Sequence, residues 1–152
     1  MCSGRARRGH KFLFTRLFVY SMPQFYSFED IESWKESRKL LWSIRQVCKR
    51  EHVKRDYNFI DQITASARSI SANIAEGNDA MTPLEFIQFL GYAKRSAAET
   101  RSHFYDALDE RYISQKEFVE LTMQTRKICG MLAKLIHHLQ AEKLRPRTFR
   151  QT

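Results

Sequence analysis

Apolar residues recur at intervals of three and four positions in four long segments of this chain. That period places side chains on one face of an α-helix. The clearest run lies within residues 57–76, where the repeating residues are Ile60, Ile63, Ala67, Ile70 and Ile74. A similar run crosses residues 28–51, and two more follow Thr82 and Ser114. Because the alternation typical of a β-strand is missing from the sequence, we predict an all-α chain.

Residues with capping chemistry separate these segments and predict where the helices begin and end. Asp56 is suited to cap the start of the second helix, and Gly77 to stop its end. Thr82 and Ser114 each stand three residues before a glutamate, the capping-box pattern that opens a helix. The connections are short, so successive helices should be antiparallel. We therefore predict an up-down-up-down antiparallel four-helix bundle over residues 28–142.

The excess positive charge lies outside this predicted bundle. The chain has 26 Lys and Arg against 17 Asp and Glu. Residues 1–21 hold five of these cations and residues 143–152 hold four, without an acidic residue in either segment. The body between them is neutral. This pattern divides the chain into a basic N-terminal extension (1–27), the bundle, and a basic C-terminal tail (143–152) that includes Arg145, Arg147 and Arg150.

The compartment and the tails can be interpreted from composition. The extension is either a disordered segment or the product of a start codon assigned upstream of Met22. Basic tails are typical of binding to nucleic acid or to a membrane surface, and equally of solubility tails. No run of 18 apolar residues exists, so no membrane-spanning helix is expected. Three scattered cysteines, Cys2, Cys48 and Cys129, do not suggest a disulfide framework, and we expect a cytoplasmic protein.

Sequence signatures of catalysis are missing. There is no glycine-rich phosphate loop, HExxH motif or CxxC motif. His137 and His138 are adjacent and would point about 100° apart on a helix, which does not suit one shared metal ion. Glu99 and His103 stand at i, i+4, whereas a di-metal bundle needs Glu-x-x-His on two helices. We expect a protein that is not an enzyme and that uses no cofactor and no metal.

The second and third predicted helices each carry a polar stripe beside the apolar one. Its members are Gln62, Ser66, Ser69, Asn73 and Glu76, and then Glu85, Tyr92, Ser96, Glu99 and His103. Antiparallel pairing across the turn at residues 77–81 predicts these neighbours: Ser69 with Tyr92, Ser66 with Ser96, and Gln62 with Glu99. A row of this kind can form an active site, but no nucleophile–base pair is evident, and a structural hydrogen-bond network is favoured.

Two members of the stripe have more specific predicted roles. Asn73 is expected to bridge the helix ends near Gly77. Glu76 is expected to accept hydrogen bonds from the free amides at the start of the third helix, where the helix dipole favours a carboxylate.

One face of the first predicted helix is basic and contains a tryptophan. Its cations lie in one arc of about 140°, with Trp42 in the middle, pointing away from the apolar face. The candidate nucleic-acid-binding residues on and beside this face are Lys35, Arg38, Lys39, Trp42, Arg45, Lys49, Arg50, Lys54 and Arg55. Cations there can neutralise phosphates while the indole stacks on a base. The alternative is that this face contacts another subunit. Acidic residues of the 106–120 region are also expected to form ion pairs with part of its charge.

Two motifs resemble a known family. They are SISANIAEG at residues 69–77 and EFIQFLGYAKRSAAE at residues 85–99, accompanied by Gln62 and by Trp34–Lys35. Together they are similar to the four-helix bundle family first noticed in intervening sequences of bacterial 23S ribosomal RNA. That family is related to the accessory variability determinant of diversity-generating retroelements. The resemblance covers about residues 28–140.

The resemblance implies a homopentamer of bundles that, in the accessory branch, binds nucleic acid and a reverse transcriptase without catalysis of its own. It also implies structural roles for the signature positions Gln62, Asn73, Glu76, Gly77, Glu85, Ser96 and Glu99. The leading hypothesis is therefore a non-enzymatic oligomeric scaffold that binds RNA or DNA, as the accessory partner of a reverse transcriptase. The alternative is an oligomeric protein-interaction module with no role in nucleic-acid binding.

Overall fold

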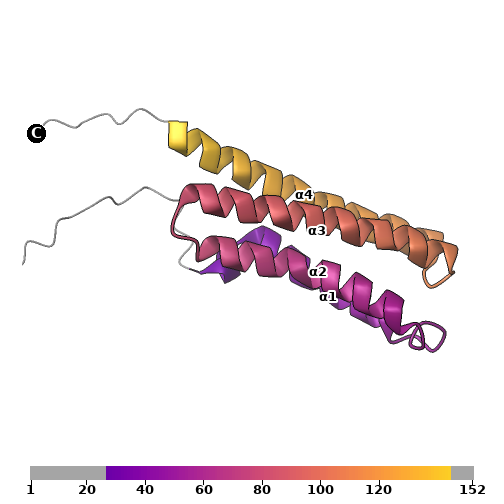
Figure 1. The fold of residues 1–152 in the computed structure, drawn as a ribbon. Helices are drawn as coiled ribbons and strands as arrows, with labels where there is room; N and C mark the ends of the chain where they lie inside the picture. Colours follow the sequence, from indigo (N-terminus) through magenta and orange to yellow (C-terminus); the bar gives the residue numbers. More distant parts are fainter. Residues whose placement is uncertain (1–26, 145–152) are drawn as a thin grey trace, which may run out of the picture.

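The computed structural model describes residues 27–144. A short 3-10 turn at Phe28–Asp30 precedes four α-helices: α1 (Glu32–Cys48), α2 (Tyr57–Asn78), α3 (Pro83–Asp109) and α4 (Gln115–Leu144). Successive helices alternate in direction, so the α1–α2 and α3–α4 connections lie at one end of the molecule and the α2–α3 connection at the other (Figure 1). The described residues are all-α. The predicted basic extension lies outside them except for Ser27. The first two residues of the predicted tail belong to α4, and the rest of it, with Arg145, Arg147 and Arg150, lies outside the described residues.

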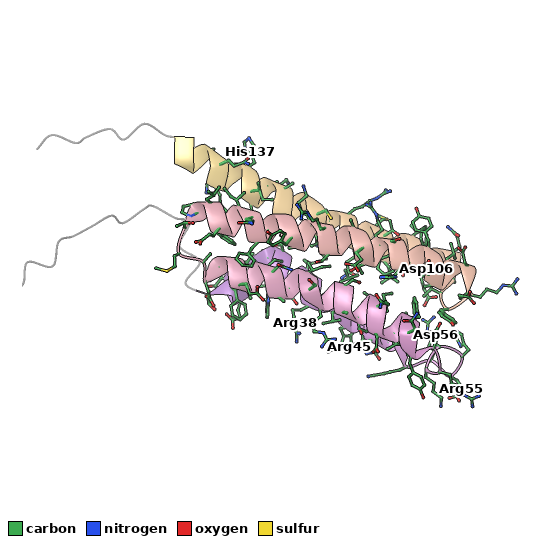
Figure 2. All side chains as sticks on the ribbon, viewed as in Figure 1. Arg38, Arg45, Arg55, Asp56, Asp106 and His137 are labelled. Carbon is green, nitrogen blue, oxygen red and sulfur yellow. The ribbon has the colours of Figure 1, made fainter. Side chains whose placement is uncertain are left out.

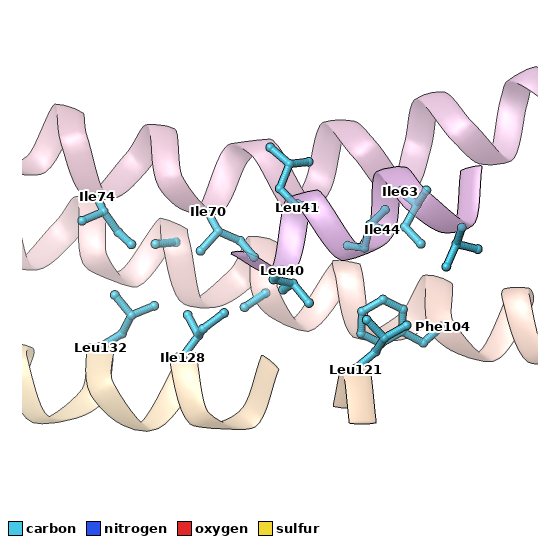
Figure 3. Packing of buried hydrophobic residues seen from close by; sticks show 14 of the residues in the cluster. Leu40, Leu41, Ile44, Ile63, Ile70, Ile74, Phe104, Leu121, Ile128 and Leu132 are labelled. Carbon is cyan, nitrogen blue, oxygen red and sulfur yellow. The ribbon is translucent and has the colours of Figure 1, made fainter. Parts of the chain in front are cut away.

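One apolar core runs along the interior of the four helices. Buried isoleucines of α2 lie in one cluster with Leu90 and Phe104 of α3, and α4 contributes Ile128 and Leu132. Leu40, Leu41 and Ile44 bring α1 into the same cluster (Figure 3). The most extensive contact is between α2 and α3. Burial of these stripes holds the bundle together, because helices of this length gain most of their stability from packing an amphipathic face.

The predicted N-terminal caps are confirmed. The Phe59 amide donates to the Asp56 carboxylate at 3.0 Å. Thr82 and Glu85 form a complete capping box at the start of α3. At the start of α4, the Ser114 amide donates to the Glu117 carboxylate at 2.8 Å and the Glu117 amide to Ser114 Oγ at 3.3 Å. These side chains satisfy amides that the first helical turn leaves free.

The first helix is shorter than predicted from residues 28–51. It starts at Glu32, because the chain before it forms the 3-10 turn and Ile31 is extended. It ends at Cys48, where the chain bends so that Val53 is fully buried in the core. Val53 therefore anchors the α1–α2 connection and stops α1 before Glu51.

Gly77 does not end α2 as a left-handed stop, and this prediction is wrong. The helix continues through Gly77 to Asn78, and no described glycine has a positive φ. A Cβ atom at position 77 would lie 2.8 Å from Phe86 Cδ2 and 2.8 Å from Phe89 Cβ. The glycine is required because α2 and α3 approach each other too closely there for any side chain.

The polar stripes of α2 and α3 do meet, but one helical turn away from the predicted register. Ser96 Oγ donates to Ser69 Oγ at 2.9 Å, and Thr100 Oγ1 donates to Ser66 Oγ at 3.1 Å. The predicted pairing put Tyr92 and Ser96 in these places. The shift arises because α2 extends to Asn78 and the chain uses the residues up to Thr82 to reverse.

The predicted roles of Asn73, Glu76 and the Gln62–Glu99 pair also differ from the structure. Asn73 Nδ2 donates to the Ser69 carbonyl at 2.8 Å and to Ser69 Oγ at 3.0 Å, so Asn73 stays within its own helix and does not bridge helix ends. Glu76 is exposed, and Glu85 instead accepts the Thr82 amide at 3.0 Å. Gln62 and Glu99 are both exposed, and no hydrogen bond joins them in the described part of the chain.

Candidate nucleic-acid interface

The outer face of α1 carries a row of large side chains that point to solvent. Trp42 is 65% exposed, which confirms its predicted direction away from the core. Arg38, Arg45 and Lys49 are also exposed, at spacings of four, three and four residues around it. Residues at these spacings share one side of a helix. We call these four residues the α1 row; Figure 2 shows Arg38 and Arg45 projecting from that helix.

Several predicted cations have acidic partners within the chain. Lys35 Nζ lies 2.7 Å from Glu32 and Lys54 Nζ 2.8 Å from Glu51. Lys39 Nζ lies 2.7 Å from Glu36, whose other carboxylate oxygen accepts from Lys127 Nζ of α4 at 3.0 Å.

Glu36 is the charged group that sequence patterning missed. It is buried on α1, and the hydrogen bonds from Lys39 and Lys127 hold the pKa of its carboxyl below the ordinary value. The only sequence signal was its i, i+3 spacing to Lys39.

Arg50 joins the two loops at one end of the bundle. Its Nη1 donates to the Tyr112 carbonyl at 2.8 Å, and its Nη2 pairs with the Glu117 carboxylate. The Tyr112 hydroxyl in turn donates to Asp56 at 2.9 Å. The Arg50 hydrogen bond and the Ser114 amide lower the pKa of Glu117 from 4.5 to about 2. This ion pair confirms the prediction that acidic residues of the 106–120 region pair with part of the charge predicted for residues 28–51.

Four of the predicted cations have no acidic partner among residues 27–144. They are Arg38, Arg45, Lys49 and Arg55. The Arg38 guanidinium lies 5.8 Å from the Trp34 ring centroid, a cation–π contact that orients it along the helix surface. Arg55 lies beyond the row, in the α1–α2 connection (Figure 2). The structure thus brings the unpaired cations of α1 together around Trp42 and separates them from Arg55.

Trp42 stands between two hollows of the surface. One, of about 370 Å³, is bordered by Arg38, Lys39 and Arg45 and has Leu41 at its base. The other, of about 270 Å³, lies between α1 and α4 and is bordered by Arg50, Glu117 and Glu120. The indole therefore separates a cationic hollow from one in which acidic groups outnumber basic ones.

Other reactive groups of the described chain are dispersed. Burial raises the pKa of the Cys48 and Cys129 thiols. His103 Nδ1 lies 3.2 Å from Asp106, its neighbour on α3. No cluster of three His, Cys, Asp or Glu residues is placed to hold a metal ion within residues 27–144. None of the helices between these limits has the length and apolar character needed to cross a membrane.

The fold and the α1 row define the class of protein: an all-α bundle with an exposed aromatic and basic helix face. Within that class, the chain belongs to the family of 23S rRNA-intervening sequence proteins, whose sequence model matches residues 29–134. Among solved structures, it is similar to a crystal structure of a protein with unknown function from the S23 ribosomal protein family of Bacteroides thetaiotaomicron VPI-5482. The TM-score is 0.64 at 24% identity, with 69% of this chain and 95% of that chain covered. No curated protein matches the chain.

Proposed function

We propose that this protein is a non-catalytic oligomeric scaffold that binds single-stranded nucleic acid through the α1 row. The observation that carries the proposal is Trp42, 65% exposed among Arg38, Arg45 and Lys49, none of which has an acidic partner in residues 27–144. The family name supports a relation to RNA. In this role, the scaffold and the reverse transcriptase implied by the family resemblance would bind the same nucleic-acid molecule.

The dimensions of the row suit a single strand. Arg38 and Lys49 are separated by about 16 Å along the helix axis at 1.5 Å per residue. Phosphates placed along that length can release counterions to the cations. The indole supplies a stacking surface that accepts any base. The pairing of Lys35, Lys39, Arg50 and Lys54 within the chain concentrates the free charge at the row.

Changes in the row should affect binding in two distinguishable ways. Trp42→Ala should weaken single-strand binding by about 1–3 kcal/mol and leave the salt dependence nearly unchanged, because this variant removes the stacking surface and no charge. Arg45→Ala combined with Lys49→Ala should weaken binding and flatten the slope of log affinity against log salt by about 0.7 for each phosphate that is no longer neutralised. Fluorescence anisotropy with labelled RNA and DNA at several salt concentrations measures both effects.

The matched control removes two exposed cations from α4, Arg126→Ala with Lys134→Ala, which lowers the net charge equally and changes no residue of the row or of the two hollows. A chain shortened to residues 22–142 separates the α1 row from the basic ends. If the shortened chain does not bind and Trp42→Ala has no effect, the basic ends alone bind. If the full chain does not bind at low salt, the protein-interaction alternative replaces this proposal.

Assembly is the part of the proposal that both functional hypotheses share. Tyr105 of α3 packs on Phe118 of α4 with ring centroids 4.8 Å apart, and Val119 and Met123 follow on α4. Tyr105, Val119 and Met123 are 44–65% exposed, which favours a subunit contact.

We expect a closed cyclic oligomer, with a pentamer of 18.1 kDa chains reaching about 90 kDa. Multi-angle light scattering at micromolar concentration measures the mass. Met123→Glu should shift it toward the monomer, and a wild-type mass near 18.1 kDa would refute assembly.

A further inference from the structure

The hollow between α1 and α4 has the size and the walls of a site for one small planar group. Its volume is about 270 Å³. That is just below the 300–1,000 Å³ typical of pockets for drug-sized ligands. Buried Val47 and Leu121 provide apolar surface at its base, and the exposed Trp42 indole forms one edge. A flat ring entering there would be covered by apolar atoms and stacked on the indole.

Two glutamine side chains give this hollow polar groups that nothing else uses. Gln46 reaches it from α1 and Gln124 from α4, and both are half-buried. Neither carboxamide has a hydrogen-bond partner within residues 27–144. Each offers an acceptor oxygen and two N–H donors. Half-buried, unpartnered amides on facing helices are suited to the hydrogen-bonding edge of a ligand.

The charges around the hollow disfavour a phosphate and favour a ligand with N–H donors. Glu117 and Glu120 contribute carboxylates, whereas the Arg50 guanidinium is already bonded to Glu117 and to the Tyr112 carbonyl. Glu120 has only a 4.0 Å contact with Lys116 of its own helix, so its oxygens can accept further bonds. On the other side of Trp42, Arg38 and Arg45 border a cationic hollow that suits a phosphate.

We propose that the α1–α4 hollow binds one unstacked nucleobase that carries an exocyclic amino group, with adenine preferred over the other bases. The phosphates of the same strand lie along the α1 row, so this inference rests on the proposed function. Glutamine carboxamides pair with the N6/N7 edge of adenine, and carboxylates accept from exocyclic amino groups. Uracil presents a carbonyl oxygen where adenine presents its amino group, and that oxygen faces Glu120 unfavourably. Trp42 then holds the base while Gln46 and Gln124 select it.

The experiment measures anisotropy of the full chain with labelled oligoadenylate and oligouridylate of equal length. We expect oligoadenylate to bind about tenfold more tightly, the order of discrimination that one bidentate contact provides. Gln46→Ala with Gln124→Ala should bring the ratio of the two affinities close to one without changing the salt slope. Gln140→Ala, an exposed glutamine of α4 outside the hollow, should keep the ratio. Equal affinities in the wild type, or a preference kept by the double variant, would overturn the inference and leave the proposed function standing.

A second measurement tests whether another subunit fills the hollow instead. In a Trp34→Phe background, Trp42 is the only tryptophan, and acrylamide quenching reports its accessibility. We expect strong quenching in the free protein and protection on adding oligoadenylate. Protection before any oligonucleotide is added would assign the hollow to a subunit contact and overturn the inference. Failure of both oligonucleotides to bind would instead reject the proposed function itself.

Discussion

Gly77→Ala should destabilise the protein by about 1–3 kcal/mol, the range for overpacking a tightly filled contact. The added methyl would lie 2.8 Å from Phe89 Cβ, an atom fixed to the α3 backbone, and 2.8 Å from Phe86 Cδ2. Rotation of a flexible side chain therefore cannot relieve the contact, and α2 and α3 must move apart. That movement would loosen the most extensive helix pair of the fold.

Gly91→Ala is the matched control, because Gly91 is also helical and nothing lies within 4 Å of its added Cβ. This variant should gain up to about 1 kcal/mol, because alanine favours a helix more than glycine does. Urea denaturation of both variants measures the contrast. Equal midpoints would show that α2 and α3 do not approach each other closely at position 77.

Arg50→Met should also have a large effect, a loss of about 2–3 kcal/mol of unfolding free energy at neutral pH. The substitution keeps an apolar stem and removes the bonds to the Glu117 carboxylate and the Tyr112 carbonyl. Glu117 also caps α4, so its position depends on Arg50, which lies in the α1–α2 connection. The loss should appear as a lower midpoint in urea with an unchanged slope.

The pH dependence of the same variant isolates the Glu117 pair. Since the folded-state pKa of Glu117 is about 2, below its unfolded value, the pair stabilises the protein above about pH 4.5. This contribution falls as the pH drops toward 2. The contribution of the pair to the unfolding free energy is about 1–2 kcal/mol, because solvent screens the charges of two side chains that are each about a third exposed.

The acid-induced loss between pH 4.5 and 2 should therefore be smaller in Arg50→Met than in the wild type. The hydrogen bonds from Lys39 and Lys127 also lower the pKa of the Glu36 carboxyl, and both proteins keep these lysines, so Glu36 contributes equally to the acid sensitivity of the two proteins. Identical acid sensitivity of the two proteins would contradict the Arg50–Glu117 contact.

Features that depend on near neighbours in the chain could be predicted from the sequence. The α2 apolar stripe, the Asp56 cap and the two capping boxes each involve residues at most four positions apart. The outward direction of Trp42 follows from the same helical period. At this range the backbone geometry of one helix decides which side chains meet, and no tertiary information is needed.

The register between helices could not be predicted, because it depends on the length of a turn. Because α2 continues two residues beyond Glu76, the partner of Ser69 on α3 is Ser96 and not the predicted Tyr92. For the same reason Ser66 pairs with Thr100. Thr100 was not among the predicted members of the network, although it stands four residues after Ser96 on the same helical face. Errors of one or two residues at a helix end therefore become errors of a full turn across the bundle.

The sequence by itself determined that this chain forms α-helices, where they are capped, and which α1 side chains face away from the core, since all of these follow from spacing along one helix. Only the tertiary structure decided which α1 cations are free and why Gly77 must be glycine. From α4, Lys127 pairs with Glu36 of α1 and Glu117 pairs with Arg50 of the α1–α2 connection. From α3, Phe86 and Phe89 approach α2. The physical reason is that ion pairing and steric exclusion depend on distances between helices, and packing of the whole core sets those distances.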